Sequence, residues 1–147
     1  MHRLALIVLL LAGCEGCAAF TAHAPDVHPI LGGPRVIEVR PTPALRLAWA
    51  TVEYCVGRHE PIDRYRWFLV DGERFYVPLP DGRDSISVVG YHDLARRRIY
   101  FARTWAGEPA LWRHEILHAL GVHYHGGGVY AACGALPTPA EPFEAVE

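Results

Sequence analysis

Residues 109–121 read PALWRHEILHALG, and the interpretation of the whole chain begins from this stretch. The proline near its start and the glycine at its end are typical of helix termini and predict a helix over residues 108–120. His114 and His118 are four residues apart, so both side chains project from one face of that helix. Two imidazoles in this arrangement can bind one metal ion. Glu115 points to a neighbouring angle, where a carboxylate can take a proton from metal-bound water.

The segments before this helix predict an α+β fold. Residues 36–40 alternate as a short strand does, and apolar side chains at helical spacing predict a helix over residues 43–56. Thr42 is expected to cap that helix and Gly57 to end it. An Asp-Gly pair at 71–72 predicts a hairpin between the first two of four further strands. Those strands are expected at residues 65–70, 74–79, 85–91 and 97–102, in a mostly antiparallel arrangement.

The N-terminus has the features of a signal segment. Residues 4–12 form an apolar run, shorter than the roughly 20 residues that a membrane-spanning helix needs. Residues 11–14 read LAGC, which resembles the lipobox of bacterial lipoproteins. That resemblance implies removal of residues 1–13, lipidation of Cys14 and attachment to a membrane of the bacterial cell envelope through the N-terminal lipid. In an envelope with two membranes, the absence of an aspartate after Cys14 favours the outer membrane.

Composition divides the remaining chain into three parts. Residues 14–35 contain prolines and glycines without a helical or strand period and are expected to form a tether. Residues 36–134 are expected to form one folded domain, and residues 135–147 a proline-rich acidic tail. The formal net charge is -2 at pH 7, which argues against a nucleic-acid partner. We expect a monomer.

The motif in the 108–120 helix resembles the active-site helix of the zincin metallopeptidases. The metzincin branch of that family extends the motif to HExxHxxGxxH, and the matching residues here are His114, Glu115, His118 and Gly121. Tyr124 stands where the last histidine would be, the only methionine is Met1, and Arg113 replaces the usual uncharged residue before the first histidine. The resemblance implies a backing helix, a sheet and an active-site helix, with Zn²⁺ as cofactor. It also implies Glu115 as the catalytic residue and a peptide or protein as substrate.

Two histidines are candidates for the third metal ligand. Glutamates after the motif lie among prolines, where a helix is not expected, and the last aspartate is Asp93. If the chain is extended beyond the helix, His123 and His125 face one way. Three glycines follow His125 and free its backbone, and the small bacterial lipoproteins that this chain resembles carry their third histidine a few residues past the helix. We therefore expect His114, His118 and His125 as ligands, with His123 as the alternative.

Two cysteines are expected to form a disulfide. Cys55 lies at the end of the first predicted helix and Cys133 follows the ligand-bearing segment, so in an oxidising envelope their pairing would pin that segment against the helix. Cysteine ligation of zinc is the rival interpretation, but neither Cys55 nor Cys133 is part of a CxxC spacing.

Two functions remain as alternatives. The first is zinc-dependent hydrolysis of peptide bonds in the cell envelope, with an extended substrate pairing with the strand at residues 97–102. The second is a non-catalytic zinc-binding envelope lipoprotein, in which an additional histidine closes the coordination sphere. His92 is expected at the surface.

Overall fold

A computed structural model of the protein describes residues 29–79, 82–125 and 128–135. The predicted signal segment, the predicted lipidation site Cys14 and most of the predicted tether lie outside the described residues, as do residues 136–147. The named helices and strands begin at Val36 and end at Ala132, inside the predicted domain. Within this part of the chain the fold is α+β, as predicted.

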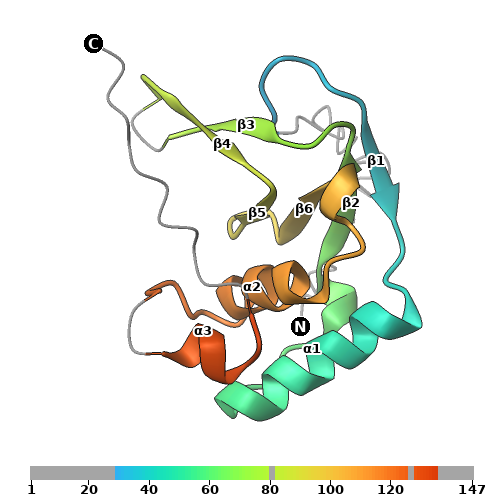
Figure 1. Cartoon of the computed structure of the whole chain (residues 1–147), viewed down its shortest axis with the longest axis vertical. Coiled ribbons are helices and arrows are strands. Elements are labelled where there is room, and N and C mark those ends of the chain that lie inside the picture. Colours follow the sequence, from blue (N-terminus) through green and yellow to red (C-terminus); the bar gives the residue numbers. More distant parts are fainter. Residues whose placement is uncertain (1–28, 80–81, 126–127, 136–147) are drawn as a thin grey trace, which may run out of the picture.

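The strands form two sheets, with helices to one side. Figure 1 shows the helices beside one face of the larger sheet and the smaller sheet on its other side. Among the described strands, β2 and β6 form the one parallel pair, so the predicted mostly antiparallel arrangement is confirmed. The larger sheet has the order β1-β2-β6-β5 and consists of β1 (Val36–Val39), β2 (Arg66–Val70), β6 (Arg98–Ala102) and β5 (Gly90–Asp93). The smaller sheet pairs β3 (Phe75–Pro78) with β4 (Ser85–Val88), and the helices are α1 (Pro43–Val56), α2 (Pro109–Ala119) and α3 (Val129–Ala132).

The larger sheet is the middle layer of the fold. All five residues of β6 are buried, because alternate side chains face opposite layers. Ile99 and Phe101 pack into the cluster that contains the helices, whereas Tyr100 and Ala102 pack into the cluster formed with the smaller sheet. The sheet therefore supports α2 on one face while the β3–β4 pair covers the other.

The ends of α1 are where the sequence places them. The Thr42 side chain accepts a hydrogen bond from the backbone N–H of Leu45 at 3.2 Å, and Pro43 is the first helical residue. Gly57 ends the helix in the left-handed conformation with φ 66°. The buried residues of the helix are Leu45, Ala48, Trp49 and Val52.

The predicted hairpin around residues 71–72 is wrong. β2 pairs with β1 and β6 rather than with β3, and β3 pairs with β4. A tight type I′ hairpin needs positive φ at both central residues, but of this pair only Gly72 has it. The turn therefore leads the chain out of the larger sheet and into the smaller one. β2 is buried on both faces, which suits a strand with two neighbours.

Two further expectations concern the elements beside the site. The strand expected at residues 85–91 is divided in two: β4 belongs to the smaller sheet and β5, which begins at Gly90, to the larger one. The helix expected at residues 108–120 is confirmed as α2. Its cap is Glu108, whose side chain accepts from the backbone N–H of Ala110 at 3.1 Å.

The end of the predicted tether contacts the fold. The backbone N–H of Leu31 donates to the carbonyl of Tyr76 at 2.9 Å, and Ile30 packs against the cluster under the smaller sheet. The N–H of Asp71 donates to the carbonyl of Arg35 at 3.0 Å. Attachment to the fold therefore begins several residues before β1.

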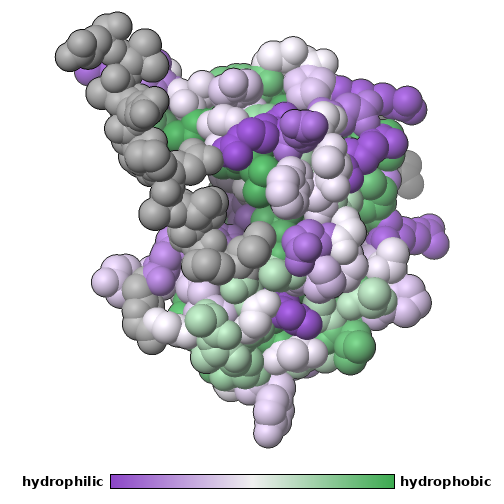
Figure 2. Space-filling model, viewed as in Figure 1, coloured by the Kyte–Doolittle hydropathy of each residue, from purple (hydrophilic) through white to green (hydrophobic). Residues whose placement is uncertain are grey.

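Hydrophilic and hydrophobic residues are mixed on the face that Figure 2 shows, with hydrophilic ones prominent on the side where β1 lies in Figure 1. The described helices include none that combines the length and apolar character needed to cross a membrane.

Candidate metal centre

The centre is built on α2 and on the turn that follows it. Gly121 has φ 81° and its N–H donates to the carbonyl of His118 at 2.9 Å, while the N–H of Val122 donates to Leu117 at 2.9 Å. This left-handed ending reverses the chain, so residues beyond it return along the helix. Arg58 donates to the carbonyl of Leu120 at 2.5 Å, which places a cation at the negative end of the helix dipole.

Three imidazole nitrogens meet at this end of the helix. The Nε2 atom of His118 lies 3.1 Å from that of His114, and the Nε2 atom of His125 lies 3.3 Å from each of them. Zinc–nitrogen bonds of 2.0–2.1 Å in tetrahedral geometry put neighbouring ligand nitrogens about 3.3 Å apart. The three nitrogens therefore fit one face of a tetrahedral site, and these histidines could hold a metal ion.

His123, the alternative ligand, lies beside the three-nitrogen cluster. Its ring is stacked on that of His118, with centroids 5.9 Å apart and planes at 11°. Tyr124, at the position of the last metzincin histidine, is 80% exposed. The structure thus brings together His114, His118 and His125. Their assignment as ligands stays a prediction.

A backbone carbonyl orients His118. The Nδ1 atom of His118 lies 3.0 Å from the carbonyl oxygen of Val122, and the Tyr130 hydroxyl donates to the same oxygen at 2.8 Å. With the proton on Nδ1, Nε2 presents its lone pair to the cluster. Burial, together with His114 and His125, lowers the pKa of His118 to about 3. The ring is therefore neutral, which is the state that binds metal.

Tyr130 packs under all three imidazoles. Its ring centroid lies 4.8 Å from that of His114, 5.9 Å from that of His118 and 4.7 Å from that of His125. The residue is 2% exposed. Because its hydroxyl is engaged with Val122, Tyr130 fixes the histidines in place rather than facing the open side of the centre.

Glu115 lines the same cavity as the three histidines. This cavity has a volume of about 540 Å³, and strands β4 and β5 form its opposite wall. Glu115 is 4% exposed, and burial raises the pKa of its carboxyl group to about 8. A cation bound nearby would favour the ionised form. The cavity therefore combines a candidate cation site with a carboxyl group whose pKa is raised toward neutral pH and above.

Three residues of β5, Gly90, Tyr91 and His92, line this cavity, and the sequence did not connect them with it. The surface position expected for His92 is wrong, since the ring is half-buried in the cavity wall. Burial and the nearby His123 lower the pKa of His92 to about 4. Gly90 lies against Glu115. A glycine inside a strand pattern often marks such a close approach, and that signal could have identified it.

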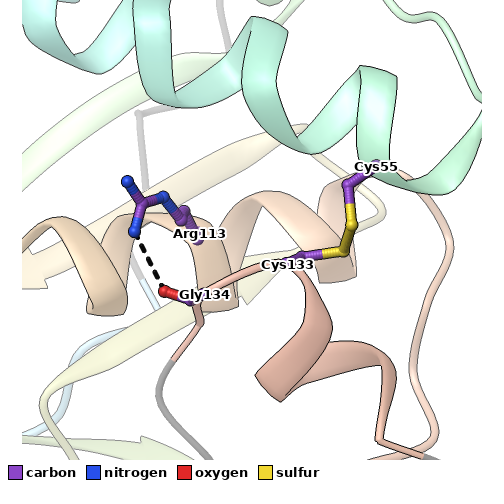
Figure 3. The surroundings of a disulfide bond; sticks show 4 residues. All are labelled: Cys55, Arg113, Cys133 and Gly134. Atoms are coloured by element: carbon purple, nitrogen blue, oxygen red, sulfur yellow. Dashed lines mark hydrogen bonds between the residues drawn. A yellow bond between two sulfur atoms is a disulfide. The ribbon is translucent and has the colours of Figure 1, made fainter.

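The predicted disulfide is present. Cys55 at the end of α1 is joined to Cys133 just after α3, as Figure 3 shows. Arg113 on α2 donates to the carbonyl of Gly134 at 3.1 Å in the same region. The segment that contains Tyr130 is therefore held to α1 by a covalent bond and to α2 by a hydrogen bond.

Comparison of the chain with protein-family models, with curated proteins and with solved structures gave no match. The zincin resemblance of the helix motif stays a prediction, and the chemistry proposed for the centre rests on the geometry of its own residues.

Proposed function

We propose that the protein is a zinc-dependent peptidase. The observation that carries this proposal is the position of Glu115, a buried carboxyl group lining the same cavity as three clustered imidazoles. Catalytic zinc sites usually have three protein ligands and one open position, and three histidines are one of the known donor sets. A bound Zn²⁺ would supply Lewis-acid activation of a water molecule and of a carbonyl group. His125 is on the exposed side of the cluster, so the centre is open to a substrate.

Glu115 is the proposed general base and general acid. Its carboxylate accepts a proton from the water whose oxygen attacks the scissile carbonyl carbon. When the carbon–nitrogen bond breaks, Glu115 returns that proton to the leaving amine. A pKa raised by burial suits both steps, because the group must bind the proton and then release it near neutral pH.

The strand expected to bind the substrate needs correction. β6 (Arg98–Ala102) lies between β2 and β5 and has no free edge, so an extended peptide has no backbone groups to pair with there. β5 is the edge strand on the side of the cavity, and Gly90, Tyr91 and His92 line the cavity wall. We propose that a peptide substrate pairs with β5.

The test combines metal analysis with a peptidase assay on a fluorogenic peptide library. Glu115→Gln is expected to keep zinc and to lose at least about 10²-fold in kcat. Separate His114→Ala, His118→Ala and His125→Ala variants are expected to lose zinc and activity together, whereas His123→Ala keeps both. His59→Ala, an exposed histidine bound to Glu53, is the matched control. Undiminished hydrolysis by Glu115→Gln would refute the proposed role.

A non-catalytic zinc-binding lipoprotein is the second candidate, because the ring of His123 lies beside the cluster and offers a fourth imidazole. Four protein ligands make a closed site that acetohydroxamic acid does not enter, whereas three leave it open.

For both candidate functions we propose a location in the cell envelope, with a lipid on Cys14. The Cys55–Cys133 bridge fits an oxidising compartment. Intact-mass analysis of membrane fractions tests the lipid, and an unmodified Cys14 would contradict it.

A further inference from the structure

Gly90, the first residue of β5, lies directly against the side chain of Glu115. A Cβ atom at position 90 would overlap Oε1 of Glu115, and it would lie 2.9 Å from Cδ and 3.0 Å from Cγ. Real Cβ atoms essentially never approach another heavy atom so closely. The carboxyl group therefore occupies space that any other residue at position 90 would fill.

The backbone gives no reason for a glycine here. Gly90 is not among the described residues with positive φ, and it pairs with Phe101 in the regular antiparallel register of β5 and β6. Glycine in a strand weakens it, because the residue loses more backbone entropy on folding and packs no side chain. Position 90 requires a glycine because a side chain there would overlap the side chain of Glu115.

We infer that Gly90 is a positioning residue for Glu115. Its bare Cα lets the carboxyl group lie against β5, where we propose that the substrate binds, in the cavity that the three histidines also line. The overlap created by an alanine would fall on the far end of a flexible side chain, so rotation of Glu115 would relieve it without moving the backbone. Alanine at position 90 would thus displace the carboxylate while leaving the fold and the histidines in place. The inference rests on the proposed function of Glu115.

The direct test is Gly90→Ala in the zinc-loaded, full-length protein. We expect kcat to fall at least about 10²-fold, which is the scale of a lost general base, with zinc content unchanged. Gly107→Ala is the matched control, because Gly107 also lacks positive φ and a Cβ there would meet nothing within 4 Å. In a Glu115→Gln background, Gly90→Ala should have no further effect on kcat. An unchanged kcat in the single variant, or equal losses in both backgrounds, would overturn the inference.

A binding measurement separates this inference from the proposed function. Acetohydroxamic acid gives up a proton when it chelates a metal, and a carboxylate beside the metal can accept it. With zinc bound, we expect Gly90→Ala and Glu115→Gln to weaken acetohydroxamate binding alike, about 10-fold or more, the equivalent of one pKa unit of proton affinity. If the wild-type protein hydrolyses no peptide, the proposed function fails, but this comparison still decides the role of Gly90. Unchanged binding in Gly90→Ala would contradict it.

A stability comparison covers the case in which Gly90→Ala folds poorly. If the overlap with Glu115 is the cause, Glu115→Ala in the same chain removes the overlapping atoms and restores the thermal midpoint. A midpoint that stays low in Gly90→Ala/Glu115→Ala would mean that the glycine serves the backbone, and the inference would be wrong.

Discussion

Removing the Cys55–Cys133 bridge is the perturbation with the largest expected effect on stability. Cys133 is 5% exposed and packs in the core cluster with the helices, so alanine is the replacement that leaves no polar group buried there. In Cys55→Ala/Cys133→Ala the segment after α3 keeps the hydrogen bond from Arg113 to Gly134 but loses its covalent link to α1. The folded structure is retained, and the unfolded chain becomes less constrained.

The expected magnitude follows from the length of the closed loop. The two cysteines are 78 positions apart in the chain. In the chain-entropy account a loop of that length stabilises the folded state by about 4.5 kcal/mol at 25 °C. For a domain of about 100 residues, each 1 kcal/mol moves the thermal midpoint by roughly 4–8 °C. We therefore expect the midpoint of the double variant to fall by about 20 °C or more.

The assay is thermal unfolding with EDTA present, so that metal binding does not contribute. Wild-type protein is measured with and without dithiothreitol. The double variant is the control, because it has no Cys55–Cys133 bridge for dithiothreitol to reduce. We expect reduced wild type and the double variant to share one low midpoint. Zinc affinity should fall in both, because Tyr130 lies in the released segment. Equal midpoints for oxidised wild type and the double variant would refute this account of the bridge.

Three further predictions concern single side chains. Burial lowers the pKa of His92 to about 4, so the unfolded chain takes up the proton first as pH falls; the contribution of His92 to stability should decrease between pH 6.5 and 4 by at most about 3 kcal/mol. Glu115 and His118 also titrate in the folded protein, so the measurement is the difference in stability between wild type and His92→Gln in urea titrations with EDTA, and a difference that does not change with pH would contradict the prediction. Tyr130→Phe keeps the ring but removes the donor to Val122; zinc affinity, measured by chelator competition, should fall about 10-fold, and unchanged affinity would show that the hydroxyl does not orient His118. Thr42→Ala removes the cap of α1 and should cost about 1 kcal/mol in unfolding with zinc affinity unchanged; a loss of zinc would mean that α1 controls the centre.

Local signals predicted α1 and α2 well because the ends of these helices depend on contacts between near neighbours, whereas the short α3 was not predicted. Thr42 bonds to Leu45 and Glu108 to Ala110, both within three residues along the chain. The hairpin prediction failed for the opposite reason. The Asp-Gly pair is a local signal, but the partners of β2 are set by burial on both of its faces, which requires β6 from a distant part of the chain.

The same division holds for the site. His114, Glu115 and His118 were predictable because the helix period alone places them. Gly90 and His92 come from an edge strand of a sheet whose order the sequence did not reveal, so nothing local connected them with Glu115. The disulfide was predictable because Cys55 lies in the last turn of a helix whose limits were clear.

The departure from the metzincin pattern at Tyr124 has a geometric explanation. After Gly121, the carbonyl oxygen of Val122 contacts Nδ1 of His118 and accepts a hydrogen bond from the Tyr130 hydroxyl. These contacts fix the position of the backbone from which the following residues extend. In an extended chain alternate side chains face the same way, and Tyr124 is 80% exposed while His125 reaches the cluster. A histidine at position 124 would therefore face solvent. The one-residue displacement of the histidine places it on the side of the chain that faces α2.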